Sequence, residues 1–400
     1  ACAYNGGTTW TGMKPRRSVL WVVATQWRGQ AWSGGDDPNV HTPGLVELAA
    51  RGVSYSQATT PHPFGPFARA AMLTGVPSPE NGVRDYFDPL PRSARTIAHE
   101  MKEAGHRTAH FGKWHLSRRD PKAPLVGEVH ARQIVPEADR GGFEFWEGFE
   151  SGFLLNDPWL HGTRLAEPVQ ITGYQSDVLV DRTAAWIHEQ DQSWFAVMDL
   201  EAPHPPYNAA TPVGIEELEM SSILLRENVP DSATVRARQD LVGYYRHIAA
   251  TDRAIARLVS ELPDDVVVIV TSVHGDMHGS HGRFRKGWPY EESVRVPFIV
   301  AGAPGAETGS INPASVSLLD LPAMTRNWSA GRAWVCIREQ APISMPSVVK
   351  LPDQADRIWS GWRSADRKVI HLADDSPWLE FDLEKDPTER ENLADSSAQS

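Results

Sequence analysis

The chain has 400 residues, of which 41% are hydrophobic and 22% charged, and its formal net charge is −12. This composition is typical of a globular protein with a large core. The acidic balance argues against a nucleic-acid partner, because such partners are bound by a surplus of Lys and Arg. No apolar run approaches the length of about 20 residues that spans a membrane.

The first 17 residues are predicted to be a flexible leader, with Met13 as a potential native start. The basic start and apolar run between Lys14 and Ala24 are too short for a secretion signal and lack a small-residue cleavage site. They predict a first buried strand instead. The two cysteines, Cys2 and Cys336, make no disulfide framework, so we expect the protein in the reducing cytoplasm.

Short β-branched runs alternate with helical stretches along the chain, which predicts an α/β fold with a mostly parallel central sheet flanked by helices. Strands are expected at Val19–Ala24, Thr108–Phe111, Phe195–Leu200, Val266–Thr271 and Phe298–Ala301. Helices are expected at Gly44–Arg51, Arg69–Leu73, Ile97–Ala104, Val178–Gln190 and Val235–Glu261.

The pattern of strand-like and helix-like segments changes after about Gly309. We therefore divide the chain into a main α/β domain at 18–309 and a small C-terminal α+β subdomain at 310–400. Within the latter, the segment 359–393 predicts a hairpin and a helix.

Polar residues follow four of the predicted strands: Thr25-Gln26, Lys113 to His115, Glu201 to His204, and His274 to Asp276. In parallel sheets, ligands bind at the carboxyl ends of the strands. An active site is therefore expected where these four segments meet.

Several segments, in consistent order, resemble type I sulfatases of the alkaline phosphatase superfamily. Arg69-Ala-Ala-Met-Leu-Thr-Gly resembles the end of that family's nucleophile motif, and residues 104–116 resemble its second signature. Further matches lie at 38–45, 202–207, 274–282, 286–293 and 381–393. The resemblance covers roughly Ser18 to Leu393 and implies the alkaline phosphatase/sulfatase fold.

The family's nucleophile is missing from this pattern. Sulfatases attack with a Cys or Ser that is oxidised to formylglycine, in the motif Cys/Ser-x-Pro-x-Arg. Counted back from Arg69, that position falls on Gly65, or on Phe64 if Ala68 is an insertion. Ser and Cys are absent from Thr60 to Gly75, and the nearest hydroxyls belong to threonines.

The metal ligands are depleted as well. The family has an Asp straight after the first strand, where this chain has Thr25 and then Gln26, and an Asp before Asn or His, where it has Val273-His274. A hard cation needs several anionic oxygens. We therefore expect neither calcium nor magnesium at this position, and no other cofactor.

The cationic and acid–base positions of the family remain. Lys113, His115 and His204 are predicted to be catalytic. Arg69, Lys286, His274, Gln26 and Thr25 are predicted to bind an anionic small molecule. Three cations and two histidines around one point should repel one another unless an anion binds there, and they should lower the histidine pKa values.

Two local alternatives stay open at this point. His274, Asp276, His278 and His281 could form a zinc site, since imidazole and carboxylate suit that metal. The aromatic residues between Gly141 and Trp159 could wall the pocket and contact an apolar substrate.

Three functions are compatible with this sequence. The first is a repurposed, metal-independent enzyme that performs acid–base or transfer chemistry on a sulfate, phosphate, phosphonate or carboxylate, for instance in specialised-metabolite biosynthesis. The second is a catalytically silent pseudo-sulfatase that binds or scaffolds. The third is a residual ester hydrolase that uses water activated by a metal or a histidine. A homo-oligomer also stays open.

Overall fold

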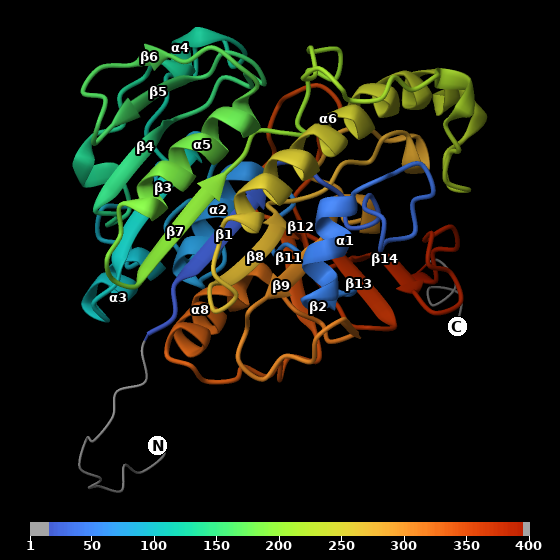
Figure 1. Ribbon diagram of the computed structural model, residues 1–400. Coiled ribbons are helices and arrows are strands. Elements are labelled where there is room, and N and C mark those ends of the chain that lie inside the picture. Colours follow the sequence, from blue (N-terminus) through green and yellow to red (C-terminus); the bar gives the residue numbers. More distant parts are fainter. Residues whose placement is uncertain (1–15, 395–400) are drawn as a thin grey trace, which may run out of the picture.

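The computed structural model describes residues 16–394 (Figure 1). The predicted leader lies outside this range except for its last two residues. A ten-stranded sheet, in the order β10-β2-β9-β8-β1-β7-β3-β4-β5-β6, forms the centre of the molecule. Its strands are β1 Val19–Ala24, β2 Gly52–Tyr55, β3 Arg107–Lys113, β4 Phe145–Phe149, β5 Trp159–Gly162, β6 Val169–Gln170, β7 Trp194–Asp199, β8 Val267–Ser272, β9 Phe298–Ala301 and β10 Ser310–Asn312.

The middle of this sheet is parallel. Strand β1 pairs in parallel with β7 and β8, and β3 pairs in parallel with β7 and β4. Antiparallel pairs occur only toward the edges, at β2–β9, β8–β9, β4–β5 and β5–β6. The predicted mostly parallel α/β fold is confirmed, and the five predicted strands correspond to β1, β3, β7, β8 and β9.

Helices cover both faces of the sheet (Figure 1). Their bounds are α1 Pro43–Ala50, α2 Gly65–Thr74, α3 Ile97–Glu103, α4 Glu128–Ala131, α5 Gln175–His188, α6 Thr234–Ser260, α7 Glu291–Val294 and α8 Leu321–Ser329. Alternate residues of β1 divide between two cores. Val19, Trp21 and Val23 pack on the side of α2, α3 and α8, while Leu20 and Val22 pack on the side of α1, α5 and α6. This two-residue alternation is the geometry of a strand buried on both faces.

A second, antiparallel sheet contains β11 Ala341–Met345, β12 Trp359–Arg363, β13 Arg367–Leu372 and β14 Pro377–Asp382. The predicted hairpin at 359–393 is confirmed, but no helix forms in that range. In β13, Lys368 and Ile370 are buried while their neighbours are more exposed, which is strand periodicity. Strand β10, which lies just after the predicted domain boundary at residue 310, pairs with β2 in the large sheet. The predicted boundary stays a prediction.

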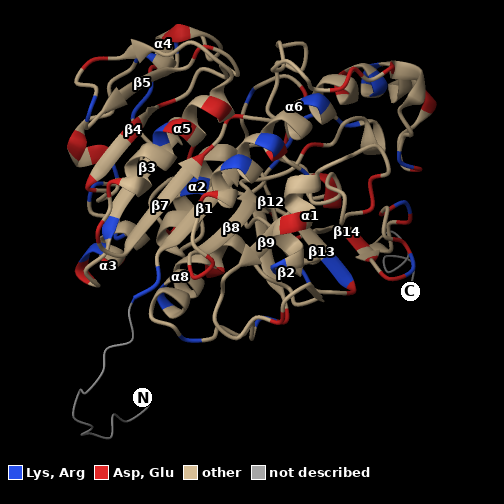
Figure 2. Cartoon of the chain, in the orientation of Figure 1, with Lys and Arg blue, Asp and Glu red and all other residues tan. Residues whose placement is uncertain are grey.

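Acidic and basic residues are intermixed along the helices and loops rather than separated by element (Figure 2). Within residues 16–394, no helix combines the length and the apolarity that a membrane crossing requires. The longest, α6, carries charged residues along much of its length, including Arg246 and Arg253.

Candidate functional site

All eight predicted site residues line one pocket of about 370 Å³. Four loops at the carboxyl ends of β1, β3, β7 and β8 supply most of them, as the parallel sheet requires. Helix α2 supplies Arg69, and the loop before α7 supplies Lys286. The eight residues are Thr25, Gln26, Arg69, Lys113, His115, His204, His274 and Lys286. Their chemical roles stay predictions.

Arg69 is held in place by a carboxylate at the end of β7. Its Nε donates to Asp199 Oδ2 at 2.8 Å and its Nη2 to Asp199 Oδ1 at 2.6 Å. Nη2 also donates to Thr25 Oγ1 at 2.8 Å, and Thr25 in turn donates to the carbonyl of Leu200. The third guanidinium nitrogen, Nη1, is buried and has no hydrogen-bond partner within the described structure.

Lys113, the last residue of β3, also has an acidic partner. Its Nζ donates to Glu201 Oε1 at 2.7 Å and lies 4.6 Å from the centre of the Phe153 ring. Burial lowers the pKa of Lys113 to about 8, although the Glu201 carboxylate opposes that shift. The ammonium is therefore mostly charged at neutral pH and loses its charge in the mildly alkaline range.

These carboxylates correct the expectation that the cations need a bound anion to coexist. Asp199 and Glu201 compensate Arg69 and Lys113 within the fold. Lys286 differs, because no carboxylate of residues 16–394 lies within ion-pair distance of it. Its Nζ donates to Gln26 Oε1 at 2.7 Å and lies 2.9 Å from His204 Nε2. Burial, together with the charge of Lys113, holds the pKa of Lys286 well below its usual value.

His204 has partners at both ring nitrogens. Its Nδ1 lies 2.8 Å from the carbonyl oxygen of Pro205, which can only accept, so Nδ1 carries the proton. Its Nε2 is then the acceptor for the Lys286 amine. The ring also stacks on Phe153, with centroids 4.4 Å apart. This arrangement positions Lys286 and leaves neither nitrogen of His204 free for a substrate.

His115 and His274 differ in the hydrogen-bonding group that each leaves without a partner, which is a donor on His115 and an acceptor on His274. The Nε2 of His115 lies 2.8 Å from Arg119 Nη1, and a guanidinium only donates, so the proton of neutral His115 resides on Nδ1. The Nδ1 of His274 lies 2.9 Å from the Gly275 carbonyl and carries the proton there, which leaves Nε2 with a lone pair. Both remaining atoms, His115 Nδ1 and His274 Nε2, are buried without a partner among the described residues.

All three pocket histidines are neutral near pH 7. Burial is the largest cause that lowers their pKa values well below 6.5, and neighbouring cations lower them further. Arg119 adds most to this effect at His115, and Lys286 adds most at His204 and His274. The direction of the pKa shift is the predicted one, but burial, rather than the predicted effect of the cations, is its largest cause.

The residues at the family's metal position do not fit a hard divalent cation. Gln26 Oε1 accepts from Lys286 Nζ, which places an amine against the only side-chain oxygen that Gln26 offers. Gln26 Nε2 donates to Asp276, and Thr25 Oγ1 is bonded to Arg69. Val273 is an aliphatic side chain with no exposed surface. Calcium and magnesium need several anionic oxygens, and this set supplies none.

The two residues predicted at the family's nucleophile position, Gly65 and Phe64, lie beside the pocket. Gly65 begins α2 and lines the pocket, as does Phe64. The nearest threonines are occupied elsewhere: Thr60 donates to the carbonyl of His62, and Thr74 donates to that of Ala70. Neither threonine lines the pocket.

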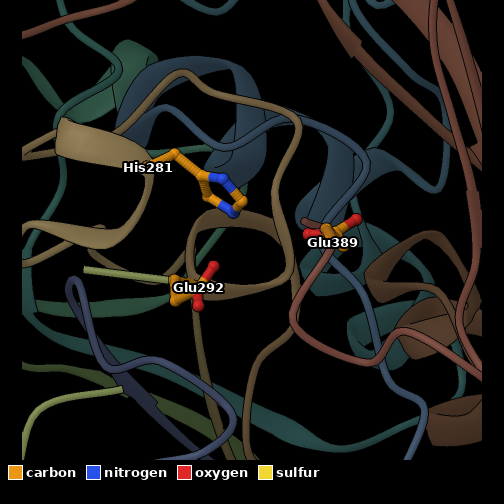
Figure 3. A group of neighbouring side chains, drawn as sticks. All are labelled: His281, Glu292 and Glu389. Carbon is orange, nitrogen blue, oxygen red and sulfur yellow. The ribbon is translucent and has the colours of Figure 1, made fainter. Parts of the chain in front are cut away.

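The alternative prediction of a zinc site is wrong, because its four residues do not converge. His278 lies 3.5 Å from Asp276, but neither groups with His281. Among residues 16–394, His281 instead approaches Glu292 and Glu389 (Figure 3). Those two carboxylates are already paired with cations, Glu292 with Arg226 and Glu389 with Lys368.

Several residues of the site were given no role in advance. Glu201 belongs to a segment expected at the active site but was not expected to pair with Lys113. Asp199, the last residue of β7, could have been found by the same rule. Phe153 belongs to the aromatic segment 141–159 that was expected to wall the pocket, whereas most other aromatic side chains of that segment are buried in the cores. Pro205 and Pro206 belong to the matching segment 202–207. No local signal marks the other wall residues, which are Tyr86, Leu125, Val126, Arg285 and Leu351 to Gln354.

Comparison with known proteins gives consistent results. The Sulfatase family profile matches residues 17–325. An ulvan-active sulfatase of Formosa agariphila is 30% identical over 296 residues, which are 71% of this chain and 55% of that protein. This chain thus spans about half the length of that relative. A choline-sulfatase of Rhizobium meliloti is 25% identical over 94% of this chain and 82% of its own length.

Among solved structures, the candidate sulfatase yidJ of Bacteroides fragilis superposes with a TM-score of 0.81 and 21% identity. The superposition covers 98% of this chain and 94% of that one, so the fold is shared almost throughout. With its family profile, its relatives and its fold in agreement, this chain belongs to the sulfatase family.

Proposed function

We propose that this protein is a metal-independent enzyme that acts on an anionic small molecule by acid–base or transfer chemistry. Membership of the sulfatase family supports a sulfatase-like or related hydrolase function at the coarser level. The observation that carries the finer proposal is the hydrogen-bonding inventory of the pocket. Two buried donors, on Arg69 and His115, and one buried acceptor, on His274, have no hydrogen-bond partner among residues 16–394. All three residues line the same pocket as Lys113.

Each side chain then has a role that follows from its protonation. Lys113, Lys286 and Arg69 attract the anion. His115 Nδ1–H donates a hydrogen bond to the anion, and the lone pair of His274 Nε2 can accept a proton as a base. His204, predicted as catalytic, becomes a positioning residue for Lys286, because both of its nitrogens are engaged.

The substrate class follows from the pocket wall and from the relatives. Relatives named for ulvan and choline sulfate act on sulfated compounds, which fits an anionic substrate. Phe64, Phe153, Leu351 and Val126 give this pocket an apolar side. We therefore propose an anion with an apolar or ring-bearing body. The proposal also places the protein in the cytoplasm and its reaction in the biosynthesis of a specialised metabolite.

Anion binding is tested with phenyl sulfate, phenyl phosphonate and benzoate, by calorimetry on the purified protein. Replacing Lys286 by Met should weaken binding about tenfold or more, because an amine of the pocket is lost. The matched control is Lys102→Met, since Lys102 is exposed on α3, away from the pocket. Equal affinities in wild type and Lys286→Met would contradict the proposed site.

Turnover is tested by mass spectrometry on panels of sulfated, phosphorylated and carboxylated aryl compounds, with metal content measured on the same sample. His115→Ala and His274→Ala should each reduce turnover about 100-fold. Activity that disappears on chelation would establish the residual hydrolase instead. Binding without turnover of any panel member would favour the silent binding protein.

A further inference from the structure

The absent side chain of Gly65 leaves two polar atoms facing the pocket. A β-carbon built on Gly65 would lie 3.0 Å from His115 Nδ1 and 3.1 Å from Arg69 Nη1. These are the same two atoms that are buried without a hydrogen-bond partner in the described part of the chain. His115 and Arg69 are only 4% and 3% exposed. Any residue other than glycine at position 65 would crowd both atoms.

Both atoms are donors. A guanidinium has no acceptor, so Arg69 Nη1 carries its hydrogens into this space. His115 Nδ1 carries the proton because Arg119 donates to the other ring nitrogen. Buried donors are nearly always paired in folded proteins, since leaving them unpaired is costly. Two donors that face the same space and have no partner among the described residues therefore point to an acceptor supplied by a ligand.

The acceptor should be a negatively charged oxygen. The guanidinium of Arg69 repels a cationic ligand and binds an anionic oxygen more strongly than a neutral one. Helix α2 has ten residues and begins at Gly65, so its positive end faces the same place. We propose that the space between Gly65, Arg69 Nη1 and His115 Nδ1, here termed the Gly65 subsite, binds one oxygen of a carboxylate, sulfate or phosphate group of the substrate. This inference rests on the proposed function.

The glycine itself provides the test. In Gly65→Ala, the added methyl group should fill the subsite, so that phenyl sulfate and benzoate bind about tenfold more weakly or worse. The fold should survive, because Gly65 has no positive φ and alanine favours the helix. The matched control is Pro66→Ala, which changes the same helical turn but does not line the pocket, and it should bind within about twofold of wild type. Thermal unfolding of both variants monitors the fold.

A second experiment locates the bound anion in wild-type crystals, so it does not depend on whether the variants fold. Wild-type crystals soaked in selenate should show an anomalous selenium peak whose oxygen lies about 3 Å from Arg69 Nη1 and His115 Nδ1. A peak beside Lys113 and Lys286 alone, or unchanged affinity in a folded Gly65→Ala protein, would overturn the Gly65 subsite while leaving the anion pocket intact. If no anion binds to the wild-type pocket at all, the proposed function fails first.

Discussion

At the residue scale, the charge of Lys113 is the most sensitive feature of the pocket. Its side chain is 1% exposed, and its ammonium depends on Glu201 for charge compensation. Phe153 covers it from one side, and the positive charge of Arg69 acts against it. The resulting pKa of about 8 lies much closer to neutral pH than that of an exposed lysine, which is about 10.4.

Anion affinity should therefore decrease as the pH rises through about 8, because Lys113 is charged below this pKa and neutral above it. Phenyl sulfate is a suitable probe, since it does not titrate in this range. Calorimetry between about pH 7 and about pH 9.5 should show the decrease. In Lys113→Met the affinity should be lower throughout and show no change near pH 8. A wild-type affinity that stays constant across this range would contradict the prediction.

At the element scale, buried charges join the second sheet to the main domain. Lys368 on β13 lies 2.6 Å from Glu389 Oε1 and 2.8 Å from Glu291 Oε1 on α7. Arg363 on β12 pairs with the same Glu291 at 3.0 Å. Because these groups are buried, each depends on its partners for compensation. The cluster that contains His281, Glu292 and Glu389 is thus part of a structural junction between α7 and the second sheet (Figure 3).

Replacing Lys368 by Met should lower the free energy of unfolding by about 3–5 kcal/mol at pH 8, because two buried carboxylates lose their shared cation. Urea unfolding measures this loss. Burial already raises the pKa of Glu389 to about 7. A raised carboxyl pKa means that the folded state takes up protons as the pH falls through that value, so the deficit should shrink at about pH 5. Lys385→Met is the control, since Lys385 is 85% exposed, and it should unfold like the wild type.

At the scale of the whole molecule, one hydrophobic core joins the two sheets. The cluster that contains Trp21 of β1 and Phe67 of α2 also contains Ile343 of β11, Trp359 of β12 and Phe381 of β14. The second sheet also reaches the pocket, because the segment between β11 and β12 supplies Leu351 to Gln354 to its wall. Pocket and second sheet should therefore be lost together on unfolding.

Equilibrium unfolding in urea should consequently be a single transition. The midpoints measured by tryptophan fluorescence and by far-ultraviolet circular dichroism should coincide, since the shared core couples both sheets. An early transition that melts only the second sheet would show instead that the C-terminal part, predicted at 310–400, is an independent subdomain.

Much of the fold and the site follows from the sequence alone. Strand periodicity and the polar residues after β1, β3, β7 and β8 are local signals, and the geometry of a parallel sheet brings those strand ends together. The sulfatase-like motifs added Arg69 and Lys286. For this reason all eight predicted site residues line one pocket, and Gly65, the predicted position of the missing nucleophile, lines it too.

Only the tertiary structure decided what the site can do. Which carboxylate meets Arg69 or Lys113, and which partner sets the tautomer of His115 or His274, depends on atoms far apart in the chain that approach within about 3 Å. Sequence spacing carries no such information, so it could not show that the four residues of the zinc interpretation do not converge, or that both ring nitrogens of His204 have partners. The sequence determined which groups the pocket contains, and the packing determined which of them remain free to act.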